Sequence, residues 1–542
     1  MLKPNTMTIK VIPMVALHLS LTLSGNALAV LDPAEADYDL KLLGKYVFFD
    51  KISEPRRMAC VSCHDPRAGG TPIGSGVNLH QVAITGANPH TVGNIATPTN
   101  IYASLIPPLH ECALGGIGVI DELGQRTRYC GGNFWDGRAE GLPSALLPGA
   151  TRHIGDEIFY KGADLDNSLQ RYAAYFGATA DQALNPMPNP VEQNIQRQDV
   201  CEQVASSKYA PLYAQVWGEP IDCSDAEVDV SAADAGGSAE KEFDISFKRL
   251  MLAICAWQSS KDLNSWSSKR DIALRQELAC ADDGAGEFAA YYDPAVCAAE
   301  DPENWGKFPL VGFTPEENLG HDLFYNTTFP RGGEPPFPEL PVTNCSFCHL
   351  SDTAHPDGTG LEERYTDDAY HNIGTPVNPE LPADPSPGIS GFAASENASG
   401  VGSGHAQTEA QKGGFKTPTL RNTAKFKSVR NFTHNGWFKS LESLVHFYNT
   451  SAILEAADSF GTTRCEAAMT EKEAFARNCW PEAEWPDTVS TSRLVGNLGM
   501  TAAQEAAVVA YMRTLSDLET AAPPPPYKVL KAAKSSRKKT RK

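Results

Sequence analysis

The sequence has no apolar run long enough to cross a bilayer, which takes about 20 residues. The run from Val11 to Leu23 is too short. It follows Lys3 and Lys10 and precedes the small residues Ala27-Leu28-Ala29, an order typical of a cleaved secretory signal. We therefore expect a signal peptide over residues 1–29 and a periplasmic mature protein without a transmembrane segment. A retained N-terminal anchor is the alternative.

Positive charge is also scarce. The chain has 46 Lys and Arg against 66 Asp and Glu, a net charge of −20. Eight cations and no acid follow Pro526, so the rest of the chain nets −28. An acidic body favours basic protein partners through electrostatic steering, and we expect no nucleic-acid partner. Residues 526–542 should form a disordered basic tail that is either solvated or in contact with anionic lipid or another protein.

The composition is not that of a disordered chain. Of the 542 residues, 42% are apolar and 21% are charged, which is ordinary for a globular protein, and the length allows two or three domains. The stretch from Ser224 to Lys241 is rich in Ala, Asp, Gly and Ser, as in a linker. We therefore predict two domains, residues 30–235 and 236–525.

Two copies of the motif C-x-x-C-H stand 285 residues apart. In c-type haem attachment the two thiols bond to the porphyrin and the adjoining histidine ligates the iron. A redox dithiol or half of a zinc site also uses C-x-x-C, but neither needs the adjoining histidine. The sequence thus predicts two covalent haems, I and II. Their attachment cysteines and proximal iron ligands are Cys60, Cys63 and His64, and Cys345, Cys348 and His349.

Each motif is preceded by a similar segment. Residues Leu43–Asp50 and Leu319–Asn326 both read Leu-Gly, two further residues, an apolar or aromatic run, and then Asp or Asn. Such an internal repeat predicts two related haem domains.

Nine of the 13 cysteines lie outside the haem motifs. Eight of them are neighbours in pairs that flank polar or Gly-rich loops, as expected of disulfides in an oxidising compartment. Cys255 lies in an apolar helical pattern and is most simply a buried thiol. The predicted disulfides are Cys112–Cys130, Cys201–Cys223, Cys280–Cys297 and Cys465–Cys479.

Three further segments carry a resemblance. They are F-W-D-G-R-A at 134–139, F-K-T-P-T-L-R-N at 415–422, and H-N-G at 434–436 followed by an amphipathic helix. With the haem motifs in this order, residues 38–517 resemble the bacterial di-haem cytochrome c peroxidase family, including its MauG-like branch. The resemblance implies a mainly α fold with two cytochrome-c-like haem domains and long loops.

The resemblance also implies site residues near haem I. Trp135 matches the tryptophan that relays electrons between the haems, although a core aromatic is the simpler interpretation. His80 and His90 are candidates for a displaceable sixth iron ligand, while MauG-like members leave that iron open. Glu157 falls where the acid–base residue that cleaves peroxide is expected, and a solvated surface acid is the alternative.

Haem II departs from the family pattern. Its sixth ligand is a Met or Tyr that we expect just before H-x-G, and the segment 423–433 contains neither. His434 then either ligates the iron or has a supporting role, or the iron is five-coordinate. Met500 and Met512 are expected in the core. The family also implies one calcium ion between the haems, for which the Thr408 carbonyl is the candidate here.

These features lead to three hypotheses of function. The first is a peroxidase that reduces hydrogen peroxide at haem I with electrons delivered through haem II from a small donor protein, a cytochrome or a cupredoxin. The second is a MauG-like enzyme that oxidises Trp or Tyr of a partner protein. The third is a non-catalytic electron-transfer cytochrome with both irons closed.

Overall fold

The computed structural model describes most of the chain after residue 37. The predicted signal peptide, the part of the predicted basic tail beyond residue 528, His80, Glu157 and Thr408 lie outside the described residues. No helix in the described part has the length and the apolar composition that a membrane crossing requires. The described ranges are 38–73, 81–112, 128–141, 167–228, 240–326, 341, 343, 345–352, 354–382, 385–388, 412–425, 431–451, 463–489 and 495–528.

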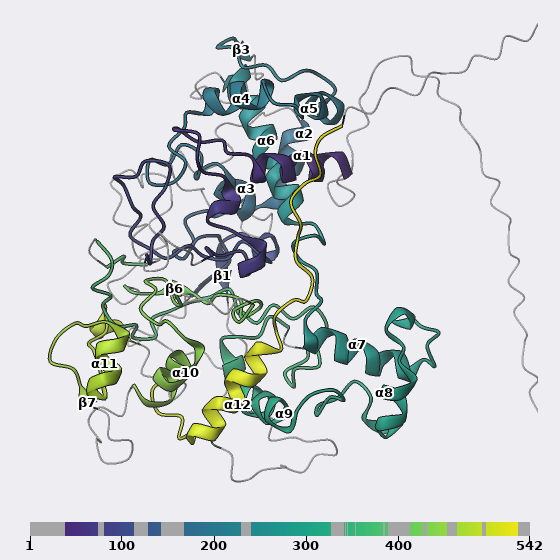
Figure 1. Ribbon diagram of the computed structural model, residues 1–542, viewed down its shortest axis with the longest axis vertical. Helices are drawn as coiled ribbons and strands as arrows, with labels where there is room; N and C mark the ends of the chain where they lie inside the picture. Colours follow the sequence, from purple (N-terminus) through teal and green to yellow (C-terminus); the bar gives the residue numbers. More distant parts are fainter. Residues whose placement is uncertain are drawn as a thin grey trace, which may run out of the picture.

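The molecule consists of two helical lobes, one above the other in Figure 1. The helices of the first lobe are α1 (Tyr38–Phe49), α2 (Asn167–Phe176), α3 (Ala178–Ala183), α4 (Arg197–Ala205), α5 (Ala210–Trp217) and α6 (Glu242–Gln258). Those of the second are α7 (Lys269–Ala281), α8 (Pro294–Ala299), α9 (Pro315–Tyr325), α10 (Leu441–Thr450), α11 (Glu471–Arg477) and α12 (Ala502–Arg513).

Strands are few and short in the described residues, which confirms the mainly α expectation. They form four two-stranded sheets, of which three are antiparallel and the last is parallel. The pairs are β1 (His110–Cys112) with β2 (Arg128–Cys130), β3 (Glu227–Val228) with β4 (Glu240–Lys241), β5 (Tyr370–His371) with β6 (Phe415–Lys416), and β7 (Thr463–Arg464) with β8 (Cys479–Trp480).

The repeated Leu-Gly segments make the same helix crossing in both lobes. Gly44 of α1 lies against α6, and a Cβ atom there would overlap the carbonyl oxygen of Ala253. Gly320 of α9 lies against α12, where a Cβ atom would overlap the carbonyl oxygen of Ala507. Only glycine lets the two backbones approach this closely. Each lobe therefore builds its haem motif on an equivalent pair of crossed helices.

We expect alanine at either crossing to destabilise its own lobe. The added methyl group meets backbone rather than a movable side chain, so Gly44→Ala and Gly320→Ala should each cost about 1–3 kcal/mol or more. Thermal unfolding of the purified protein measures this loss. Glu316→Ala, at an exposed position of α9, is the control and should change stability by less than about 0.5 kcal/mol. An unchanged melting temperature in both glycine variants would contradict the crossing geometry.

The first lobe extends beyond the boundary that composition suggested. Its hydrophobic core runs from Leu40 to Leu263 and includes most of α6. Helix α6 therefore packs in the first lobe, although the boundary at residue 235 assigns it to the second. Strands β3 and β4, which stand on either side of residues 229–239, pair with each other.

All four predicted disulfides are present, and Cys255 is a buried free thiol as expected. The Cys280–Cys297 bond joins α7 to α8 in the arm that projects from the second lobe in Figure 1. The Cys465–Cys479 bond closes the segment that contains α11.

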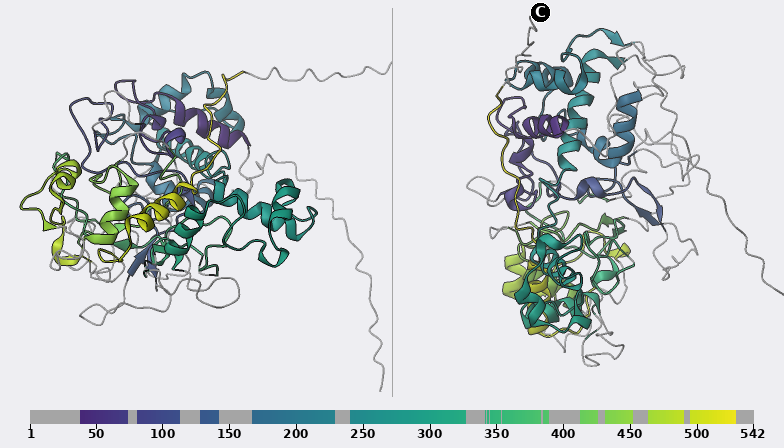
Figure 2. Two further views of the ribbon diagram at one scale, coloured as in Figure 1. Left: turned by 60° about the horizontal axis from the view of Figure 1, so that its bottom comes forward. Right: turned by 90° about the vertical axis from the view of Figure 1, so that its right-hand side faces the viewer.

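After α12 the chain returns along the first lobe, and we call residues 516–528 the C-terminal strap (Figure 2, right). Its Asp517 carboxylate accepts a hydrogen bond from the Tyr102 hydroxyl of the first lobe, at 2.9 Å. Further along, the Tyr46 hydroxyl donates to the Pro525 carbonyl at 2.6 Å, and Tyr527 packs edge-on against the Tyr46 ring. The strap therefore ties the end of the second lobe to the first helix of the first lobe.

Candidate haem cavities

Each C-x-x-C-H motif opens into a large cavity. Cavity 1 is lined by Cys60, Cys63 and His64 and has a volume of about 1340 Å³, counting space open to solvent. Cavity 2 is lined by Cys345, Cys348 and His349 and is of similar size, about 1280 Å³. These four motif cysteines are free thiols. Each cavity is thus lined by two cysteines and one histidine of its motif, and the two cavities are similar in volume.

The motif histidines are oriented as haem ligands require. His64 Nδ1 lies 3.0 Å from the Gly70 carbonyl oxygen, and His349 Nδ1 lies 3.0 Å from that of Tyr365. Because a carbonyl can only accept, each Nδ1 carries the proton and leaves Nε2 as the ligand atom. Burial lowers the pKa of both imidazoles, which favours the neutral form that binds iron. The residues therefore fit an axially ligated haem in each cavity.

Trp135 lies between the cavities. Its neighbour Phe134 has a positive φ of 66°, and this turn sends successive side chains to opposite sides. Phe134 lines cavity 1, and Trp135 lines cavity 2. The indole Nε1 donates to the Ala96 carbonyl at 2.8 Å, and the Trp135 carbonyl accepts from the Lys416 amide at 2.9 Å. The predicted relay residue is therefore held by backbone from both lobes.

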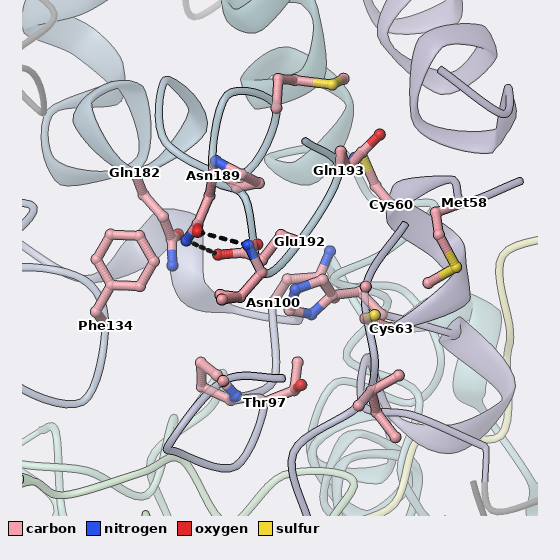
Figure 3. A pocket seen from close by; sticks show the side chains of 18 of the residues that line it. Met58, Cys60, Cys63, Thr97, Asn100, Phe134, Gln182, Asn189, Glu192 and Gln193 are labelled. Atoms are coloured by element: carbon pink, nitrogen blue, oxygen red, sulfur yellow. Dashed lines mark hydrogen bonds between the residues drawn. The ribbon is translucent and has the colours of Figure 1, made fainter. Parts of the chain in front are cut away.

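The polar side of cavity 1 is formed by the loop after α3. Gln182, Asn189 and Glu192 line the cavity, and the Asn189 amide donates to a Glu192 carboxylate oxygen at 2.8 Å (Figure 3). The Asn189 side chain also accepts from the Val191 amide, which closes the turn before Glu192. This arrangement fixes a carboxylate inside the cavity.

Arg138 completes the same wall. Its guanidinium forms an ion pair with Asp136 at 2.9 Å and lies 3.9 Å above the centre of the Phe134 ring.

Of the two histidines predicted as sixth ligands of haem I, His80 lies outside the described residues. His90 is exposed, and it is absent from the residues that line the cavity. Among the described residues, His64 is the only histidine in that wall.

His434 lies in the wall of cavity 2, but its ring is already engaged. Burial lowers its pKa, so the ring is neutral, and its Nε2 lies 2.7 Å from a Glu484 carboxylate oxygen. Phe415 stacks on the imidazole face with 3.3 Å between the ring centres. His434 therefore occupies a supporting position beside the cavity.

Tyr448 reaches cavity 2 from α10. Leu441, Leu444, Val445 and Tyr448 recur at helical spacing, and all four line the cavity. Burial raises the pKa of the Tyr448 hydroxyl, with smaller contributions from the nearby motif thiols. The described part of the chain offers this hydroxyl no hydrogen-bond partner. Met500 and Met512 belong to the second lobe's core, as expected, and they also line this cavity.

Comparison with known proteins agrees with this geometry. Residues 39–279 match the family described as di-haem cytochrome c peroxidase. The matched residues make up less than half of the chain, and they are similar to this family. The chain is 25% identical over 509 residues to the methylamine utilization protein MauG of Paracoccus denitrificans, covering 90% of this chain and 94% of that one. These similarities support an oxidoreductase of the di-haem peroxidase and MauG type, and a family of this type carries two haems.

Two solved structures of a diheme peroxidase have a similar fold. The diheme peroxidase BthA of Burkholderia thailandensis superimposes with a TM-score of 0.55 at 21% sequence identity, covering 91% of this chain and 90% of BthA. A variant of BthA gives a TM-score of 0.56 at the same identity and coverage.

Two residues that line the cavities were not singled out from the sequence. Counting on from Arg138 led to Glu157, which lies outside the described residues, whereas Glu192 lines cavity 1. The signal was Gln182 followed by a Pro-rich polar loop ending at Glu192. The sequence analysis looked for the sixth ligand of haem II in the segment that precedes His434. The apolar face of α10, which comes later in the chain, places Tyr448 in the wall of cavity 2.

Proposed function

We propose that this protein is a periplasmic di-haem c-type peroxidase. It reduces one hydrogen peroxide to two waters at haem I, consuming two protons and two electrons, and the electrons come from a donor protein through haem II and Trp135. The observation that carries the proposal is the asymmetry of the site. Two equivalent C-x-x-C-H cavities are lined by neighbouring residues, cavity 1 by Phe134 and cavity 2 by Trp135, and the loop carrying Glu192 lines only cavity 1.

Cys60 and Cys63 would hold the haem covalently and His64 would bind its iron, which would supply the redox chemistry of peroxide reduction. Glu192 supplies the proton transfer. Its carboxylate takes a proton from the inner peroxide oxygen and returns it to the outer oxygen, which leaves as water. Asn189 holds the carboxylate by its hydrogen bond, and Phe134 with the paired Arg138 covers the adjoining wall.

For haem II we propose Tyr448 as the sixth ligand. Other donors in cavity 2 have partners, because His371 Nε2 lies 2.8 Å from Asp367 and Lys416 Nζ donates to the Gly132 carbonyl. His434 is paired with Glu484. The Tyr448 hydroxyl has no partner within the described ranges, and a tyrosine oxygen is an established haem ligand.

The second candidate function is MauG-like oxidation of Trp or Tyr residues of a partner protein. Tyr448 favours it, because methionine ligation raises the potential of a haem and a tyrosine oxygen lacks that effect. A low-potential haem II is a poor acceptor for electrons from a small donor protein. It is better suited to sharing oxidising equivalents with haem I.

Steady-state assays of the mature protein separate the two functions. Peroxide consumption that depends on a reduced cytochrome or cupredoxin supports the peroxidase. Consumption that proceeds only with oxidation of a specific protein supports the MauG-like function. Failure to consume peroxide with either, or two low-spin irons in every redox state, would overturn both and leave an electron-transfer cytochrome.

A further inference from the structure

A buried carboxylate lies behind His434. The Glu484 side chain is only 4% exposed and accepts two hydrogen bonds, from His434 Nε2 and from the Asn435 side-chain amide, both at 2.7 Å. The Glu484 backbone amide donates to the Thr375 carbonyl at 2.9 Å, which fixes its position in the second lobe. Burying a carboxylate is costly, and these partners hold it in one orientation.

One residue, Ala96, joins this pair to Trp135. The Ala96 carbonyl accepts from the Trp135 indole at 2.8 Å, and the Ala96 amide donates to the His434 carbonyl at 2.7 Å. The two rings lie edge to face, with 6.4 Å between their centres and an angle of 72°. Trp135, His434 and Glu484 are therefore held in one series that spans both lobes.

This series matters when Trp135 carries charge. A peptide carbonyl has no useful basicity, so Ala96 cannot remove the indole proton, and Trp135 becomes a cation when it gives up one electron. Trp135 is 9% exposed, and a buried cation is unfavourable unless an opposite charge lies close by.

The other charges near Trp135 do not meet this need. Lys416 is itself a cation in the wall of cavity 2, and Asp136 is neutralised by Arg138. Glu484, hydrogen-bonded to His434, is the acidic side chain of this series.

We propose that Glu484, acting through His434, is a positioning residue for the relay that stabilises one-electron-oxidised Trp135. The inference rests on the proposed function and adds a residue to it. In each one-electron transfer, Trp135 gives one electron toward cavity 1, takes one from the side of cavity 2, and keeps its Nε1 proton. Two such transfers, together with two protons from solvent, reduce one hydrogen peroxide to two waters.

The experiment uses the holoenzyme with haem II reduced and haem I oxidised, mixed rapidly with one equivalent of peroxide. The rate at which haem II loses its electron is followed by its absorption. Glu484→Gln removes the charge at constant shape and should slow this rate about tenfold or more, because a close opposite charge favours a charged form by roughly ten- to a thousandfold. Glu484→Asp keeps the charge and should restore most of the rate.

Two controls isolate the effect. Glu277→Gln neutralises another buried carboxylate, which bonds the Gly306 and Val311 amides and lines neither cavity, and should leave the rate unchanged. In a Trp135→Phe background, Glu484→Gln should produce no further slowing, since its effect passes through the indole.

The inference is overturned if wild type consumes peroxide and Glu484→Gln reacts at the wild-type rate. It is also overturned if Glu484→Gln slows the reaction equally with and without Trp135, or if Glu484→Asp is as slow as Glu484→Gln. A wild-type protein that does not consume peroxide refutes the proposed function instead. The resting absorption spectrum of haem II should stay unchanged in Glu484→Gln, and a changed spectrum would assign the carboxylate to cavity 2 and not to Trp135.

Discussion

Replacing Tyr448 with phenylalanine removes an oxygen ligand from haem II and should shift its reduction potential by on the order of 0.1 V, since axial ligands set haem potentials over about 0.8 V. The change should be visible in the absorption and electron paramagnetic resonance spectra of the oxidised protein. Tyr448→Met should restore a six-coordinate iron at a higher potential, because a thioether ligand raises it. Spectroelectrochemical titration measures the reduction potential of haem II in the wild-type protein, in Tyr448→Phe and in Tyr448→Met.

The chain supplies matched controls for this experiment. Met500 and Met512 line the same cavity and belong to the core. Met500→Leu and Met512→Leu should leave the potential and the spin state of haem II as in wild type, since leucine fills nearly the same volume. If Met500→Leu or His434→Gln changes the ligand spectrum and Tyr448→Phe does not, Tyr448 is not the ligand.

Neutralising Glu192 should have the largest effect on turnover. Glu192→Gln keeps the shape of the side chain but cannot take a proton, so we expect peroxide consumption to fall by roughly 10²–10⁴-fold. Haem content and resting spectra should remain those of wild type. Asn189→Ala should give a smaller loss, because it frees the carboxylate without removing it.

Glu157→Gln tests the residue that sequence position suggested for the same role. If Glu192 is the acid–base residue, the Glu157→Gln variant should consume peroxide at the wild-type rate. The reverse pattern, in which Glu157→Gln is inactive and Glu192→Gln is not, would transfer the acid–base role to Glu157. Measuring both variants at saturating peroxide separates a loss of proton transfer from weaker peroxide binding.

Sequence reasoning succeeded where the chemistry is local. The C-x-x-C-H motifs place thiols and imidazole within five residues, and the paired cysteines close loops of fewer than 25 residues, so neither depends on the rest of the fold. The Leu-Gly repeat could also be recognised in the sequence. A close helix crossing requires glycine at the point of contact, and similar residues surround that glycine in both lobes.

The missed residues depend on long-range placement. Glu192 comes to cavity 1 from a loop more than 120 residues after His64, and a long intervening segment defeated counting from Arg138. Tyr448 was hidden by an assumption about chain order, although the apolar periodicity of α10 pointed its ring inward. Glu484 lies 50 residues after His434, and its pairing could not be read from either local sequence.

The C-terminal strap has a consequence for biogenesis. Tyr46 is joined to Pro525 across 479 residues of chain, and Tyr527 packs onto the first lobe's core. The first lobe therefore becomes complete only when residues 516–528 have been made. A chain truncated before Pro525 would leave that lobe without these contacts.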